Sequence, residues 1–160
     1  MKTILTPIDF SGVSDAVVAE AASLAKALDA RVFLFTVVQP PTQIAEYAPM
    51  LECIAEITAA GEKNAARDLG KLEEKLKSQF IRAESAYAVG PPVSHILEQA
   101  EKCDATYIVM GSHGHSAIYD LLVGSTTHGV LLRAKCPVVI VPAGKTQPPR
   151  KQKRQTVSVL

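Results

Sequence analysis

The sequence predicts a single α/β domain built on an open, doubly wound parallel sheet of five strands, with helices on both faces. Short runs rich in β-branched and aromatic residues alternate along the chain with amphipathic helical patterns. Residues 31–38 are apolar almost throughout, which is typical of a strand covered on both faces. The order strand, helix, buried strand at the start of the chain indicates a parallel βαβ unit with a right-handed crossover.

The first βαβ unit is read directly from the residue pattern. Residues 2–8 form a short run with β-branched residues that ends in turn-forming residues. Residues 14–29 carry apolar side chains three and four apart, which predicts an amphipathic helix, and Ser14 is placed to cap its start. The buried run 31–38 stops at two prolines, beginning with Pro40.

Residues 42–80 carry a second, longer helical pattern. One stripe is apolar, and the opposite face is rich in lysine, arginine and glutamate, which indicates a solvated surface. A coiled coil is the alternative, but Thr58 and Gly61 lie on the apolar stripe, so we favour packing on the sheet. Residues 81–89 then alternate and end at Gly90, which predicts an edge strand.

The rest of the chain completes the sheet. We expect, in order, a short helix opened by prolines, a buried strand, a helix and a last strand, over 93–100, 105–110, 125–134 and 137–142. Residues 143–160 lack periodicity and are expected to form a disordered tail. The folded domain is therefore expected to cover 1–142.

Composition argues against several classes of protein. A length of 160 residues suits one domain, and no apolar run approaches the roughly 20 residues that a membrane helix needs. The N-terminus has no long apolar region and no small-residue cleavage site, so we expect no secretory signal and a cytoplasmic location. Cys53, Cys103 and Cys136 are widely spaced, which suits neither a disulfide framework nor a zinc site, and we interpret them as reduced and structural.

The charge is unevenly distributed along the chain. The formal net charge is +1, but residues 143–160 contain five basic residues and no acidic one. Without them, 12 basic residues remain against 16 acidic ones, a net charge of −4. A net-negative body argues against nucleic acid as the main partner. The tail is interpreted as solubilising, with contact to nucleic acid or anionic lipid as the alternative.

The stretch 111–126, GSHGHSAIYDLLVGST, is the main candidate for a ligand site. It follows the predicted buried strand, and Gly111 and Gly114 permit the main chain to approach a ligand closely. Gly124 precedes three hydroxyl residues at the start of a predicted helix. Free amides and hydroxyls at such a position favour an anion, so we expect a phosphate here.

A second loop is expected to meet this stretch. Asp9 and Ser11 follow the first predicted strand. In doubly wound sheets, ligands bind beyond the carboxyl ends of the strands, where the strand order reverses. If the first and fourth strands are neighbours, the two loops flank one crevice.

Several motifs of this chain resemble those of one family. They are, in order, Pro7-x-Asp9-x-Ser11, Gly90-x-Pro92, Gly111-x-x-Gly114 with nine further residues before Gly124-Ser125, and Cys136-Pro137-Val138. This pattern resembles the universal stress protein family, in the form found in members that bind ATP. The resemblance implies an adenine nucleotide alpha hydrolase-like, Rossmann-like fold with strand order 3-2-1-4-5.

The resemblance also implies a ligand, its contacts and a partner. The ligand is ATP, with Mg²⁺ bridging its phosphates, and the partner is a second copy joined through the last strand, 137–142. Pro7 and Asp9 would border the adenosine, the backbone of Val37 would meet the adenine, and the glycines and hydroxyls would hold the ribose and phosphates. The implied cofactor-binding residues are Pro7, Asp9, Val37, Met110, Gly111, Gly114, His115, Gly124, Ser125 and Thr126.

His115 is a departure from the family pattern. Many ATP-binding relatives have arginine or lysine after the second glycine of the motif. The resemblance therefore implies no fixed positive charge beside the phosphates here, although a protonated imidazole would supply one.

Other chemistries have weaker support in the residues. No protein metal site is expected, because His113 and His115 stand two apart with no cysteine or carboxylate at a matching short spacing. A Ser-His-Asp hydrolase would use a GxSxG elbow, and the sequence has none. A redox role for Cys136 is an alternative to a structural thiol.

We therefore expect a regulatory module that binds ATP in stress response without efficient turnover. One alternative is a slow ATP hydrolase, in which His115 or Asp120 would position water. Another is a binder of AMP, or of a cyclic or dinucleotide, in the same crevice.

Overall fold

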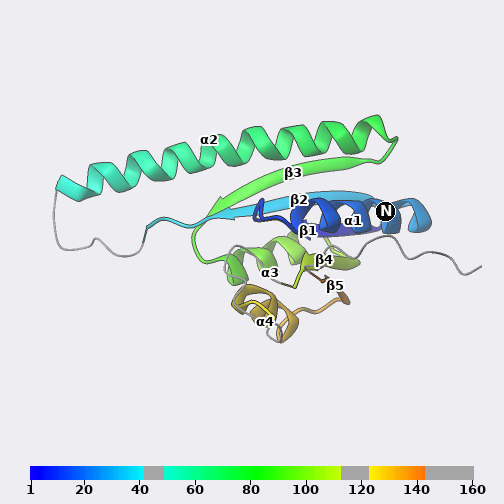
Figure 1. Cartoon of the computed structure of the whole chain (residues 1–160). Helices are drawn as coiled ribbons and strands as arrows, with labels where there is room; N and C mark the ends of the chain where they lie inside the picture. The colour runs from blue at the N-terminus through cyan, green and yellow to red at the C-terminus, as the bar shows by residue number, and fades with distance from the viewer. Residues whose placement is uncertain (42–48, 113–122, 143–160) are drawn as a thin grey trace, which may run out of the picture.

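A computed structural model describes residues 1–41, 49–112 and 123–142. They form one five-stranded parallel sheet with strand order β3-β2-β1-β4-β5, which confirms the predicted fold class (Figure 1). The predicted edge position of the third strand is also confirmed. The elements are β1 Thr3–Pro7, α1 Ser14–Leu28, β2 Arg31–Val38, α2 Pro49–Ser78, β3 Ala83–Val89, α3 Pro92–Lys102, β4 Tyr107–Gly111, α4 Ser125–Leu131 and β5 Val138–Val141.

The helices cover both faces of the sheet because successive strand residues point to opposite sides. Ile4 and Leu34 are fully buried in a cluster with α1 and α2, whereas their neighbours Leu5 and Phe35 are buried in a second cluster with α3 and α4. Figure 1 shows α2 on one side of the sheet and α3 and α4 on the other. Two apolar layers therefore enclose the strands, as the continuous apolar run of β2 predicts.

Several boundaries differ from the sequence prediction. Ser14 is the first residue of α1, and Val13 holds the N-cap position without a side-chain capping bond, so the predicted Ser14 cap is wrong. The described part of the long helix is Pro49–Ser78, and the predicted start at 42 lies outside the described residues. β4 begins at Tyr107 instead of 105, and α4 ends at Leu131, three residues earlier than expected.

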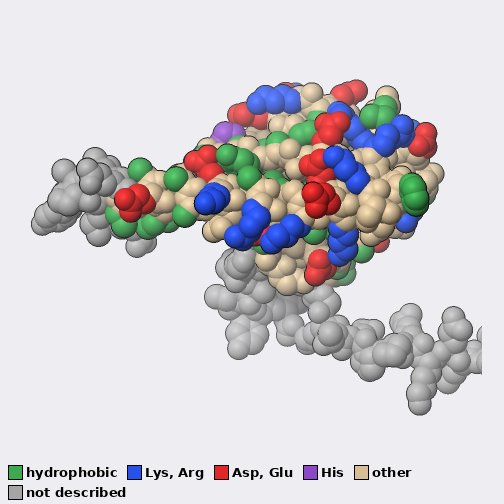
Figure 2. All heavy atoms as spheres, turned by 90° about the horizontal axis from the view of Figure 1, so that it is seen from above, with side chains coloured by type: hydrophobic (Ala, Val, Ile, Leu, Met, Phe, Trp, Pro, Cys, Tyr) green, Lys and Arg blue, Asp and Glu red, His purple; other side chains and the backbone are tan. Residues whose placement is uncertain are grey.

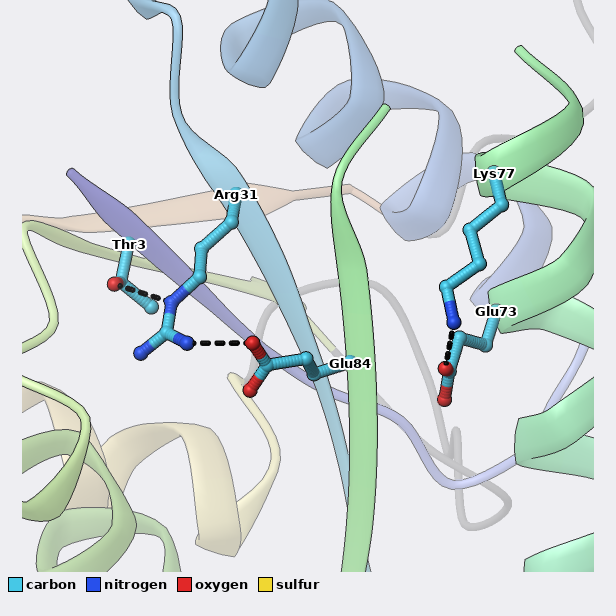
Figure 3. A network of polar contacts seen from close by, with 5 residues as sticks. All are labelled: Thr3, Arg31, Glu73, Lys77 and Glu84. Atoms are coloured by element: carbon cyan, nitrogen blue, oxygen red, sulfur yellow. Dashed lines mark hydrogen bonds and ion pairs between the residues drawn. The ribbon is translucent and has the colours of Figure 1, made fainter. Parts of the chain in front are cut away.

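Polar contacts tie the amino-terminal ends of three adjacent strands together (Figure 3). Arg31 of β2 donates from Nε to Thr3 Oγ1 of β1 at 3.0 Å. Its Nη1 also forms an ion pair with Glu84 Oε1 of β3 at 2.7 Å. Such partly exposed pairs contribute only a few tenths of a kcal/mol, ~0.2–1, so they fix the register of the strands more than they stabilise the fold.

Three helix-to-strand turns use a residue other than glycine with positive φ. Asp29 precedes β2 with φ 50°, Asp104 precedes β4 with φ 49°, and Phe80 precedes β3 with φ 61°. Aspartate tolerates this left-handed conformation, whereas a bulky residue is costly there. Phe80 is also 99% exposed, so its side chain contributes no packing to offset that cost.

Phe80→Asn is therefore expected to raise the free energy of unfolding by about 0.5–1 kcal/mol, because asparagine adopts positive φ more readily. Urea unfolding measures the change. Phe80→Ala is the matched control, since it removes the ring but keeps an unfavourable residue at the same φ. Equal gains from both variants would show that the exposed ring, and not the backbone, carries the cost.

Within the described ranges, no helix is long and apolar enough to cross a membrane.

Candidate functional site

A cavity of about 390 Å³ opens at the carboxyl ends of the strands. It lies between the chain segments that leave β1, β2 and β4 and the start of α4. β1 and β4 are neighbours in the sheet, and the strand order reverses between them. This is the switch point at which doubly wound sheets bind their ligands.

The cavity brings together most of the residues singled out from the sequence. Gly114 and His115 lie outside the described residues, so the structure places neither of them. The other eight predicted residues all line the cavity: Pro7, Asp9, Val37, Met110, Gly111, Gly124, Ser125 and Thr126.

The loop after β1 is held by the carboxylate of Asp9. Its Oδ1 accepts a hydrogen bond from the backbone N–H of Ser11 at 3.0 Å and from the hydroxyl of Ser14 at 3.3 Å. Asp9 therefore does not cap α1, where Val13 is the N-cap. The backbone N–H of Ile8 donates to the carbonyl of Phe35 at 2.8 Å, which anchors this loop to β2.

The segment between β4 and α4 is fixed at both described ends. The N–H of Ser112 donates to the carbonyl of Val141 at 2.8 Å, and the N–H of Gly124 donates to the carbonyl of Ser112, also at 2.8 Å. The buried hydroxyl of Thr127 donates to the carbonyl of Gly111 at 2.8 Å. These three bonds set the first turn of α4 directly beside the end of β4, so the hydroxyls of that turn face the cavity region.

Sequence reasoning missed the apolar wall of the cavity. Phe35 and Thr36 of β2 and Ile96 of α3 contribute to it, together with Val13 and Val17 near the start of α1. Buried strand residues give no signal in the sequence for which end or face they line. Thr127 was recognised only as one hydroxyl in a row, whereas its bond to Gly111 gives it a positioning role.

The lining divides into chemically different regions. One region is apolar, and the other presents glycine backbone and hydroxyl groups from the start of α4. Among the described lining residues there is no lysine, arginine or histidine, and Asp9 is the only carboxylate. An anion in this cavity would therefore be held by backbone amides and hydroxyls.

Comparison with known proteins shows to which family this chain belongs. The sequence model of the universal stress protein family matches residues 1–142. The chain belongs to the universal stress protein family. Universal stress protein MJ0531 of Methanocaldococcus jannaschii is 31% identical over 147 residues, which is 91% of this chain and 85% of that protein. Universal stress protein YxiE of Bacillus subtilis is 35% identical over 88 residues, which span 55% of this chain and 60% of the relative's length.

Solved structures of the family share the fold. The structure of MJ0577 of Methanocaldococcus jannaschii superposes with a TM-score of 0.78 at 24% identity, covering 91% of this chain and 98% of that one. A universal stress protein in complex with cAMP gives a TM-score of 0.64 at 27% identity, covering 88% of this chain and 96% of that one.

The three cysteines of this universal stress protein differ in environment. Cys53 is exposed, Cys103 is buried and Cys136 is half-buried. Burial raises the pKa of the Cys103 and Cys136 thiols, which lowers their thiolate fraction at neutral pH. Across the described residues, no group of three or more histidine, cysteine or acidic side chains could hold a metal ion.

Iodoacetamide at pH 8 is expected to label Cys53 first, with Cys103 and Cys136 at least about tenfold slower, because burial of these two thiols limits both the access of the reagent and their thiolate fraction. Peptide mass spectrometry over a time course measures the three rates. Labelling in denaturant, where the rates should converge, is the control. Fast labelling of Cys136 in the folded protein would support the redox reading in place of the structural one.

Proposed function

We propose that this chain binds ATP in the cavity between β1 and β4 and acts as a regulatory nucleotide-binding module in the cytoplasmic stress response. The observation that carries the proposal is the convergence of the eight residues on one cavity, because they come from four separate parts of the chain. Family membership and the related structure in complex with cAMP support the adenine nucleotide class of ligand.

The two regions of the cavity suit the two ends of ATP. The apolar wall and the backbone of Val37 would receive the adenine, with Pro7 and Asp9 beside the ribose. Gly124 and the hydroxyls of Ser125 and Thr126 would hold the phosphates. Mg²⁺ would be bound through the phosphates, since the part of the lining that the structure describes offers one carboxylate and no cage of oxygen ligands.

Binding without efficient turnover fits the described lining best. Hydrolysis requires a group that positions or deprotonates water beside the terminal phosphate. Asp9 is the only carboxylate among the described lining residues, and it accepts hydrogen bonds from Ser11 and Ser14. We assign it to the adenosine end, which leaves no described candidate at the phosphate end.

Dimerisation through the last strand belongs to the same proposal. β5, Val138–Val141, is an edge strand of the sheet, and its four residues are half-buried. An unpaired strand edge offers a row of backbone donors and acceptors to a second copy. A change in the position of Ser112 on nucleotide binding would be transmitted to β5 through the hydrogen bond from the Ser112 N–H to the carbonyl of Val141.

Mass spectrometry of the nucleotide that co-purifies with the protein tests ligand identity directly. We expect ATP, released by denaturation at up to one molecule per chain. AMP or a cyclic nucleotide would replace ATP as the ligand, and a ligand without adenine would overturn the proposal. In a parallel incubation with ATP and Mg²⁺, release of many phosphates per minute would show a hydrolase in place of a binding module.

A further inference from the structure

The first part of α2 extends past the end of the sheet. Gly61 lies against the last residue of β2, since a Cβ atom at Gly61 would be 2.9 Å from Val38 Cγ1. The helical residues before it, 49–60, form the segment that we call the α2 overhang. At 1.5 Å per residue the overhang is about 18 Å long. Figure 1 shows α2 continuing beyond the ends of β2 and β3.

The overhang is apolar but exposed. Residues 53–60 read CIAEITAA, and none of their side chains is buried. Ile57 is 50% exposed, and Glu56 is the only charged residue of the eight. Figure 2 shows this arm standing clear of the body, with hydrophobic side chains along its described part. A short, mostly apolar helical segment is marginal in water without a partner.

We propose that the α2 overhang pairs with the overhang of a second copy of this chain, antiparallel and with its two-fold axis near Ala59 and Ala60. The outer face of the helix carries Glu56 before that point and Lys63 after it, at nearly equal distances along the chain. A two-fold axis there places Glu56 of each copy opposite Lys63 of the other copy, so two such ion pairs form. A parallel pair would instead oppose like charges.

The charges that make this pairing are available for it. Glu56 and Lys63 are seven residues apart, two helical turns, so they cannot pair within one helix. Neither forms an ion pair with another described residue. The next outward cation, Arg67, is already paired with Asp68 at 3.0 Å.

The small side chains complete the match. Ala59 and Ala60 are exposed at the centre of the proposed contact, where they allow two helix axes to approach closely. The proposed contact does not involve β5. It would therefore add a second interface to any dimer that forms through that strand.

A charge swap tests the pairing. Sedimentation velocity over a protein concentration series is expected to show a smaller assembly for Glu56→Lys alone and for Lys63→Glu alone than for the wild type. An equal mixture of the two variants should restore the wild-type assembly, because every opposed pair is then of opposite charge. The double variant should also restore it. Glu74→Lys, on an exposed position of α2 away from the overhang, is the control and should change nothing.

The restoration step separates this proposal from others. Circular dichroism confirms that each variant keeps its helix content. An unchanged assembly in both single variants would overturn the proposal, as would a wild type that does not associate at any concentration tested. Loss of association without restoration by mixing or by the double variant would also overturn it, and would point to a partner other than a second copy.

Discussion

Ser125→Glu is expected to weaken ATP binding about 100-fold or more while leaving the free energy of unfolding unchanged or slightly raised. The new carboxylate would stand where the phosphates are proposed to bind, and opposing like charges costs several kcal/mol. Ser125 is exposed in the first turn of α4, so the fold tolerates a longer side chain there. A negative charge in a first turn is favourable to the helix itself, by about 0.3–1 kcal/mol. Titration calorimetry measures the affinity and urea unfolding the stability.

Ser125→Gln is the matched control, since it has the same size without the charge and should bind ATP within about tenfold of the wild type. The loss in the glutamate variant should grow from AMP to ADP to ATP, and adenosine should be nearly unaffected. An equal loss for adenosine would contradict the placement of the phosphates at α4, because the substitution would then act on the whole cavity.

Gly90→Ala is expected to lower the free energy of unfolding by about 2–3 kcal/mol. Gly90 joins β3 to α3 with φ +137°, a conformation that residues with a Cβ atom rarely adopt. A Cβ atom would also lie 2.7 Å from His95 Nε2. The turn is held by a bond from the Gly90 N–H to the carbonyl of Val38 at 2.9 Å, and it leads into Pro92 of the cavity wall.

Gly70→Ala provides a control of opposite sign. Gly70 lies within α2, and a Cβ atom there would meet no neighbouring atom within 4 Å. Alanine should therefore stabilise the protein by about 0.5–1 kcal/mol. Urea unfolding compares the two variants with the wild type. Similar effects of both substitutions would show that the turn at Gly90 imposes no special backbone requirement.

The fold could be predicted because its signals are local and agree with one another. The apolar run of β2 and the three-and-four spacing of α1 each follow from burial of one or both faces. The strand order came with the family resemblance, since periodicity alone does not say which strands are neighbours. The helix caps were harder to predict from the sequence. Ser14 is of a residue type that favours the N-cap, but its hydroxyl donates a hydrogen bond to Asp9 instead.

The part of the candidate site that consists of loop glycines and hydroxyl residues could be predicted from the sequence. Glycines and hydroxyls in loops carry a recognisable pattern, which is why Gly111, Gly124 and Ser125 could be named in advance. Phe35 and Thr36 could not, because a buried strand residue looks the same in sequence whether it packs on a helix or lines a cavity. The exposure of the α2 overhang was equally hidden, since an apolar stretch such as 53–60 resembles the buried face of a helix.

The most direct test of ATP binding is a calorimetric titration of the full chain with ATP and Mg²⁺, repeated with GTP. We expect one ATP per chain, with GTP bound at least about tenfold more weakly, because the base is proposed to meet the backbone of Val37 through position-specific contacts. No saturable binding of ATP at millimolar concentration, or equal binding of GTP, would contradict it.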